Sequence, residues 1–160
     1  MKTITTLIFI LALAVSHFAQ FSAKKVPALE LKDLKGRIVK LSNFNGKIVL
    51  LNFWAIWCGP CLAEIPELVK WHEKYKADGL QIIGITYPPT NLAYVRSFVG
   101  RKKMSYPVLL GSKATKRLFD DSDNLPITVI VDRMGNVVGR IDGVIFQDEF
   151  DAKVKPLLTP

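Results

Sequence analysis

Continuous apolar runs predict the strands of a central sheet. Residues 47–55, KIVLLNFWA, and residues 80–86, LQIIGIT, are dominated by β-branched, aromatic and other apolar side chains. This pattern is typical of strands that are buried on both faces. Shorter runs at residues 106–111 and 126–132 predict two more strands. The second of these continues through the turn RMGN into VVGRIDG at residues 137–143, which predicts an antiparallel hairpin.

Apolar positions spaced three and four residues apart predict the helices. Between Pro60 and about Ala77 this spacing places six side chains on one stripe: Leu62, Ile65, Leu68, Val69, His72 and Tyr75. Asp78-Gly79 ends that run. The same spacing predicts helices over residues 91–103 and 147–158, and residues 113–121 fit one or two helical turns.

Two short alternating segments, Leu29–Asp33 and Arg37–Leu41, flank Lys35-Gly36 and predict an N-terminal β-hairpin. Strands and helices then alternate until the closing hairpin and the last helix. This order indicates an α/β domain with a mixed central sheet flanked by helices. No repeat, low-complexity tract or linker rich in Ser, Gly or Pro interrupts the chain after residue 26, so we expect one domain over residues 26–158.

Composition and charge fit an ordinary globular domain. Of the 160 residues, 49% are apolar and 10% aromatic, which is enough for a substantial core without disulfide support. The formal net charge is +8, but basic residues cluster only at Lys24-Lys25 and at residues 101–103. A nucleic-acid surface is marked by a basic stripe or helix, so we expect no nucleic-acid partner.

Residues 1–23 have the pattern of an export segment. Lys2 precedes the apolar run Leu7–Val15, and small residues up to Ala23 could serve a signal peptidase. Phe21 extends the apolar character toward the roughly 20 residues that span a bilayer, so an uncleaved membrane anchor is the alternative to a cleaved signal peptide. No cysteine lies near the end of this segment, which excludes a lipid-anchored lipoprotein. We expect a periplasmic or other extracytoplasmic location.

The two cysteines of the chain, Cys58 and Cys61, lie in the segment FWAIWCGPC at residues 53–61. Structural zinc needs four Cys or His ligands, and after residues 1–23 the chain adds only His72 to this pair. His72 falls on the apolar stripe of its helix, where a packed histidine fits better than a metal ligand. We therefore expect no metal site, although a metallochaperone module that binds Cu(I) through paired thiolates stays as an alternative.

A dithiol–disulfide couple is the other use of these cysteines, and their position assigns their roles. The buried strand ends at Ala55 and a helix begins near Gly59 or Pro60. Cys58 therefore lies at a helix N-terminus, where free backbone N–H groups and the helix dipole favour a thiolate. Pro60 suits the first turn because no N–H is needed there. Cys61 lies one turn further in and is more shielded, so Cys58 is the nucleophile and Cys61 the resolving thiol.

The segment FWAIWCGPC resembles the active-site segment of thioredoxin-like proteins, and the resemblance covers nearly all of residues 26–158. The N-terminal hairpin, the extra segment around residues 86–118 and the export segment are similar to TlpA/ResA-like extracytoplasmic thiol-disulfide oxidoreductases, which are related to the CcmG proteins of cytochrome c maturation. The resemblance implies a thioredoxin-like fold with a central insertion, and a monomer without a cofactor. It also implies protein thiol or disulfide substrates, such as apocytochrome c or copper-site proteins, and a membrane electron donor.

Further residues join the site through this resemblance. Leu125-Pro126 matches the family segment that bears a cis-proline facing the cysteines, so we expect a cis bond, with the backbone of Leu125 available to an extended substrate. Trp57 is expected to lie partly exposed beside the nucleophile. Pro66 is expected inside the long helix, as in the family's first long helix. Trp71 fits boundary packing better than substrate recognition.

Acidic residues depart from the pattern of the relatives. Asn52 stands where thioredoxin has a buried aspartate, and Asn cannot accept the proton of Cys61. ResA-like relatives offer a glutamate in the region that here reads TYPPTN, residues 86–91, which holds no acid. The nearest carboxylate is Glu64, three residues after Cys61 on one helix face. Similar proteins carry a glutamate there, so we include Glu64 in the site; the alternative is a solvated first-turn acid that offsets the helix dipole.

The Gly59-Pro60 dipeptide between the cysteines bears on the direction of electron flow, because it is the choice of thioredoxin. Thioredoxin has a potential of about −270 mV, whereas strong oxidants such as DsbA lie at about −120 mV. We therefore predict a protein-disulfide reductase. A thiol peroxidase is the alternative enzyme, but residues 51–58, LNFWAIWC, lack the Pro and Thr of the peroxiredoxin pattern P-x-x-x-T-x-x-C.

Overall fold

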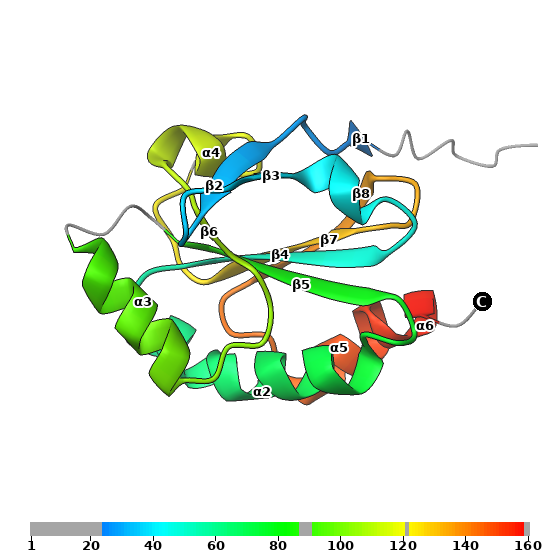
Figure 1. Cartoon of the computed structure of the whole chain (residues 1–160). Coiled ribbons are helices and arrows are strands. Elements are labelled where there is room, and N and C mark those ends of the chain that lie inside the picture. Colours follow the sequence, from blue (N-terminus) through cyan, green and yellow to red (C-terminus); the bar gives the residue numbers. More distant parts are fainter. Residues whose placement is uncertain (1–23, 87–90, 121, 159–160) are drawn as a thin grey trace, which may run out of the picture.

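The computed structural model describes residues 24–86, 91–120 and 122–158. These residues form one mixed sheet with helices packed against it (Figure 1). Its strands follow the order β1-β8-β7-β4-β5-β6-β2-β3. The proposed export segment, residues 1–23, lies outside the described residues. Among the helices of the described residues, none is long and apolar enough to cross a membrane.

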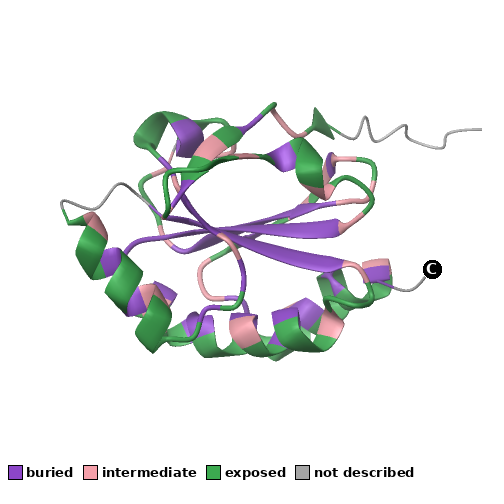
Figure 2. Cartoon of the chain, in the orientation of Figure 1, coloured by how far each residue is buried: buried purple, intermediate pink, exposed green. Residues whose placement is uncertain are grey.

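The centre of the sheet consists of the strands with continuous apolar runs. β4 (Ile48–Trp54) pairs in parallel with β5 (Leu80–Thr86) and antiparallel with β7 (Ile127–Val131). Every residue of these three strands is buried (Figure 2). The prediction of strands buried on both faces is therefore confirmed, and the parallel pair directs the carboxyl ends of β4 and β5 to the same edge of the sheet.

Both predicted hairpins are present at the flanks of the sheet. β2 (Glu30–Asp33) pairs antiparallel with β3 (Ile38–Lys40), and β7 pairs antiparallel with β8 (Asn136–Asp142). β2 also pairs antiparallel with β6 (Val108–Leu110), and this pairing attaches the N-terminal hairpin to the central strands. The pairing of β1 (Lys24–Lys25) with β8 and the 3-10 helix η2 (Leu41–Phe44) were not predicted, because both elements are too short to show a hydrophobic period.

The helices occupy two sides of the sheet. The long α2 (Gly59–Tyr75), α3 (Leu92–Arg101) and α5 (Gln147–Lys153) share one core with the side chains of Leu50, Trp54 and Ile82. On the other face, the N-terminal hairpin packs on a second core, and α4 (Lys113–Arg117) lies on that side in Figure 1. This arrangement is the predicted thioredoxin-like α/β fold, with Pro66 inside α2 as expected.

Two expectations about the helices are wrong. The predicted continuous helix over residues 147–158 is divided, because α5 ends at Lys153 and α6 (Lys155–Leu158) follows. Pro156 has no N–H to donate to the carbonyl four residues earlier and its ring crowds that carbonyl, which favours a break of the helix at this point. Trp71 belongs to the core rather than to its boundary: it is 2% exposed, and its ring stacks on Phe150 with centroids 4.3 Å apart.

Close packing under the active-site end of the sheet gives a first prediction. A Cβ atom at Gly84 of β5 would lie 3.0 Å from Trp54 Nε1 and 3.3 Å from Tyr106 Cε2, and both rings are buried. We expect Gly84→Ala to lower the free energy of unfolding by about 1–3 kcal/mol through overpacking, measured by urea denaturation.

The matched control is Gly100→Ala in α3, where a Cβ atom would meet nothing within 4 Å. This change should raise the free energy of unfolding by roughly 0.5–1 kcal/mol, because alanine favours helix more than glycine does. Equal effects of the two substitutions would contradict the packing argument.

Candidate active site

The cysteine pair lies at the junction of β4 and α2, where a buried strand passes into a helix. Cys58 and Cys61 form a disulfide, and Cys58 is the N-cap residue of α2, with its Sγ accepting a hydrogen bond from the Cys61 N–H at 3.3 Å. Gly59 and Pro60 form the exposed start of the helix. Cys58 is 6% and Cys61 0% exposed. The sulfur of Cys58 thus faces the positive end of the helix dipole, and Cys61 lies behind it.

The segment around Pro126 reaches the same end of the sheet. The Leu125–Pro126 bond is cis, and the next residue, Ile127, pairs with Phe53 near the end of β4. Trp57 is 74% exposed, and it lines a surface groove together with Leu125, Lys113 and Asp123. A groove at this place could accept a peptide segment beside the disulfide.

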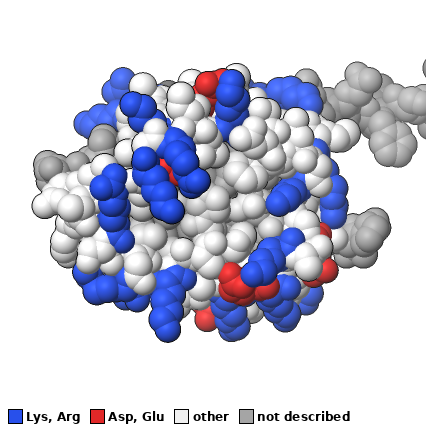
Figure 3. Space-filling model, viewed as in Figure 1, with Lys and Arg blue, Asp and Glu red and all other residues white. Residues whose placement is uncertain are grey.

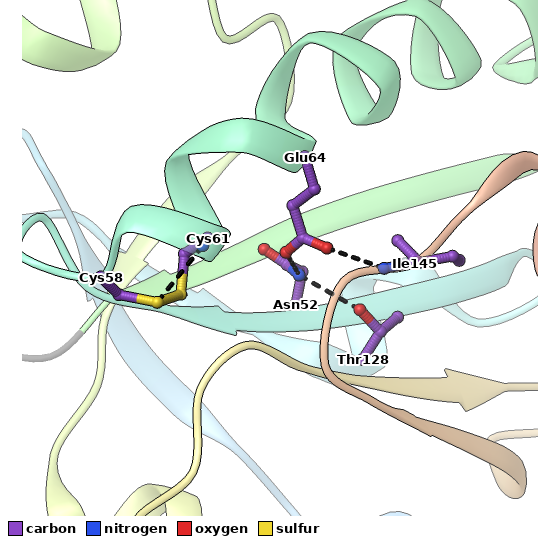
Figure 4. The surroundings of a disulfide bond; sticks show 6 residues. All are labelled: Asn52, Cys58, Cys61, Glu64, Thr128 and Ile145. Carbon is purple, nitrogen blue, oxygen red and sulfur yellow. Dashed lines mark hydrogen bonds between the residues drawn. A yellow bond between two sulfur atoms is a disulfide. The ribbon is translucent and has the colours of Figure 1, made fainter.

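Glu64 is the buried acid of the site. It is 2% exposed, and its Oε1 accepts a hydrogen bond from Asn52 Nδ2 at 2.7 Å, while its Oε2 accepts one from the backbone N–H of Ile145 at 3.1 Å (Figure 4). Asn52 Nδ2 also donates to Thr128 Oγ1 at 3.1 Å. The alternative of a solvated first-turn acid is therefore wrong, because the sheet and the loop before α5 cover the carboxyl group.

Burial sets the protonation behaviour of Glu64. Desolvation raises its pKa to about 7, against the opposing effect of the hydrogen bonds from Asn52 and Ile145, which favour the carboxylate. A carboxyl group with a pKa near neutrality can both take up and release a proton at physiological pH. The buried acid of this chain, Glu64, thus lies on the helix, one turn after Cys61. The strand residue Asn52 donates a hydrogen bond to it.

Three other buried side chains carry polar atoms. Trp54 Nε1, His72 Nδ1 and the Tyr106 hydroxyl are buried and have no hydrogen-bond partner among the described residues. Desolvation raises the pKa of Tyr106, and the charge of Glu64 raises it further. The Tyr106 ring meets His72 edge-on, with centroids 5.9 Å apart, so His72 is a packed histidine, as expected.

Sequence reasoning missed three members of this site: Thr128, Tyr106 and the backbone N–H of Ile145. Ile145 lies 81 residues after Glu64 in the chain, and a backbone donor carries no residue-type signal. Tyr106 stands at the start of an apolar run, where an aromatic residue is expected in any core. Residues 87–90, where relatives offer a glutamate and this chain has none, lie outside the described residues.

The arrangement can perform thiol chemistry. Within the described ranges 24–86, 91–120 and 122–158, no three His, Cys, Asp or Glu side chains are grouped so as to hold a metal ion. Two vicinal cysteines at a helix N-terminus can cycle between dithiol and disulfide, which transfers two electrons. The adjacent buried carboxyl group can exchange the proton that accompanies thiol ionisation.

Comparisons with known proteins agree with this chemistry. Residues 23–140 match the AhpC/TSA family. The thiol-disulfide oxidoreductase ResA of a Bacillus cereus strain is 33% identical over 135 residues, which cover 84% of this chain and 77% of that protein. The ResA of Geobacillus kaustophilus is 27% identical over 165 residues, with 98% and 94% of the two chains covered.

Solved structures show the same similarity. A thiol:disulfide interchange protein of the thioredoxin family from Chlorobium tepidum TLS superimposes with a TM-score of 0.76 at 27% identity, covering 86% of this chain and 97% of that one. A thiol:disulfide interchange protein from Bacteroides sp. gives a TM-score of 0.72 at 26% identity, with 85% and 89% covered.

The raised pKa of Glu64 predicts a pH dependence of stability. The folded protein holds this proton up to about pH 7, whereas the pKa of an accessible Glu is 4.5. The folded state therefore binds more protons between these values, and the free energy of unfolding should fall as pH rises through this window, by on the order of 3 kcal/mol. Urea unfolding at pH 5 and pH 8 measures the difference.

The test variant is Glu64→Gln, which cannot ionise and should flatten this part of the pH profile. Glu67→Gln, at an exposed position of the same helix, is the matched control and should keep the profile of the wild type. A Glu64→Gln protein with an unchanged slope between pH 5 and pH 8 would show that the acid does not titrate in this window.

Proposed function

The chain belongs to the AhpC/TSA family, and we propose that it is an exported thiol-disulfide oxidoreductase that reduces protein disulfides. The observation that carries the proposal is the Cys58–Cys61 pair at the N-terminus of α2, with the buried carboxyl group of Glu64 one turn behind it. The ResA relatives are named thiol-disulfide oxidoreductases, which agrees with this use of the two cysteines.

The catalytic cycle follows from the unequal exposure of the two sulfurs. The Cys58 thiolate attacks one sulfur of a substrate disulfide, and the other substrate sulfur leaves as a thiolate. Cys61 then loses its proton to Glu64 and attacks Cys58 Sγ, which releases the second substrate thiol. Two electrons have passed to the substrate, and the protein holds the Cys58–Cys61 disulfide. A dithiol donor reverses these exchanges and restores the two thiols.

The direction of the cycle rests on the residues between the cysteines. Gly59 and Pro60 are the pair found in thioredoxin, whose potential of about −270 mV lies at the reducing end of the family. A reductase in an oxidising compartment needs a continuous supply of electrons. We assign the electron donor to a dithiol protein of the membrane. Apocytochrome c and copper-site proteins are the proposed substrates.

Substrate binding is assigned to the groove beside the disulfide. Trp57 offers an exposed aromatic face, and the backbone of Leu125, next to the cis-proline Pro126, is placed to pair with an extended segment. We assign the catalytic unit to a monomer, because the cysteines, the acid and the groove all come from one chain. Residues 1–23 serve as signal peptide or membrane anchor in this proposal, and residues 26–158 as the catalytic domain.

Substitution of each cysteine by serine tests the roles assigned to the two thiols. Cys58→Ser should abolish the reduction of insulin disulfides by the protein with a dithiol donor, because the nucleophile is lost. Cys61→Ser should stop turnover and trap mixed disulfides with substrate, because the resolving thiol is lost. Non-reducing electrophoresis detects the trapped species, and turnover by the Cys58→Ser protein would refute the order of the two thiols.

Two further outcomes would replace the proposal. Tight Cu(I) binding in an anaerobic titration, without insulin reduction, would favour the metallochaperone module. Faster turnover with hydrogen peroxide than with a protein disulfide would favour a thiol peroxidase.

Replacement of Pro126, which follows the groove residue Leu125, tests the substrate groove. Pro126→Thr should raise KM for a protein disulfide by on the order of tenfold, because the backbone of Leu125 is no longer held for pairing. The reaction of the reduced protein with a small aromatic disulfide should change far less, since that reagent needs no extended pairing. Equal KM values for the protein disulfide in variant and wild type would remove Pro126 from the site.

A further inference from the structure

Charge is distributed unevenly along the sequence. From Gly79 to Phe119 the chain contains no Asp or Glu, although it contains several basic residues: Arg96, Arg101, Lys102, Lys103, Lys113, Lys116 and Arg117. The N-terminal hairpin adds four basic residues, Lys32, Lys35, Arg37 and Lys40, against two acids, Glu30 and Asp33. The net charge of +8 is therefore concentrated in the hairpin, α3 and α4.

The hairpin and α3 lie side by side in the fold. Arg96 Nε of α3 donates a hydrogen bond to the backbone carbonyl of Leu34 in the hairpin turn, at 2.6 Å. In the space-filling view, Lys and Arg side chains surround an uncharged area on this face of the molecule (Figure 3). Two elements that are distant in sequence thus build one basic surface.

A groove with an apolar floor runs between the two elements. It is lined by Leu34, Val39, Phe44, Val99, Pro107 and Val108, and also by Lys35 and Arg37. Most of these apolar side chains are only half-buried, so the floor is open to solvent. Lys102, the C-cap residue of α3, and Lys103 directly follow the helix end that contains Val99, and Lys102 Nζ lies 5.9 Å from the centroid of the Phe98 ring.

The cations around the groove are available to a ligand. Lys35, Lys102 and Lys103 form no ion pair with any residue in the described ranges. The acid of the groove, Asp33, is already engaged: its carboxylate accepts hydrogen bonds from the Arg37 side chain and from the backbone N–H groups of Lys35 and Arg37. The groove therefore carries uncompensated positive charge.

Lys103 also occupies an unusual backbone position. Its φ of 50° places it in the left-handed region, and it is the non-glycine residue with positive φ among the described residues. Glycine is the usual residue at such a helix end. Lys103 thus places a cation directly after α3 despite the less favourable backbone conformation.

We propose that this groove binds an acidic, amphipathic segment of a partner protein. Carboxylates of the segment would meet the free lysines of the rim, and its apolar side chains would cover Leu34, Val99 and Pro107 on the floor. The concave shape favours a peptide over an anionic membrane, because a flat lipid surface would reach the rim but not the floor. The groove is separate from the disulfide, so the inference does not depend on the proposed reductase activity.

Binding of a designed probe tests the groove. The probe is a short fluorescein-labelled peptide in which pairs of Glu alternate with single Leu residues, and fluorescence anisotropy with the full chain gives its Kd. Lys35→Glu combined with Lys102→Glu should weaken binding by on the order of tenfold, because two attractions become repulsions. Val99→Ser should weaken it severalfold by removing apolar contact, without any change of charge.

The matched control has the same change of net charge on exposed lysines elsewhere, Lys24→Glu combined with Lys74→Glu. It should alter Kd by less than about twofold, because charges beyond the Debye length of about 8 Å are screened at physiological salt. If the two double variants lose the same amount of peptide affinity, the effect comes from the net charge of the protein and not from the groove, and the proposal is overturned. Binding to phosphatidylglycerol vesicles that depends on Lys35 and Lys102, without peptide binding, would assign the surface to a membrane and also overturn it.

Insulin reduction by the same variants separates this inference from the proposed function. All of them should retain the turnover of the wild type, since none alters the disulfide site. A wild-type protein that binds the probe but reduces no disulfide would refute the reductase alone. One that reduces disulfides but does not bind the probe would refute the groove alone.

Discussion

The buried carboxyl group of Glu64 is the constraint to which the rest of the active site is fitted. Its two hydrogen bonds join α2 to β4 through Asn52 and to the loop before α5 through the N–H of Ile145. The same loop is joined to the cis-proline segment, because the N–H of Gly143 donates to the carbonyl of Pro126 at 2.9 Å. Cys61 and Glu64 on α2, Asn52 on β4 and the segment at Pro126 are therefore connected through one set of hydrogen bonds.

Placing the acid on the helix instead of on the strand changes how proton and thiol are coupled. Cys61 and Glu64 belong to one rigid turn, so their separation is set by helix geometry and not by packing between elements. Asn52 supports this arrangement because a neutral amide donates to the carboxylate at any pH and does not compete for its proton. A second carboxylate at that position would disfavour ionisation of the pair and raise one pKa further.

The sequence predicted the elements whose signal is local. Continuous runs marked β4, β5 and β7, and the strand-to-helix junction placed Cys58 at an N-cap, because these patterns depend on neighbours in the chain. The role of Glu64 could not be resolved this way, since a glutamate one turn after the helix start looks the same whether a loop covers it or solvent does. The covering loop is 81 residues away, and its donor is a backbone N–H group. The burial of Glu64, and with it the raised pKa of its carboxyl group, depends on a contact between distant parts of the chain that sequence periodicity cannot show.

Charge acts differently at the two grooves of the molecule. The groove beside the disulfide carries Lys113 and Asp123, whose opposite fields cancel beyond short range, so its selectivity rests on contact. The groove between the hairpin and α3 carries free charge of one sign, which attracts an acidic partner at a distance of about a Debye length, 8 Å, before contact. Both elements that form it lie outside the central strands β4, β5 and β7. The proposals thus assign the binding of an acidic partner and the thiol-disulfide exchange to separate surfaces. Substitutions that alter the basic groove can therefore change the choice of partner without altering the hydrogen bonds of Glu64.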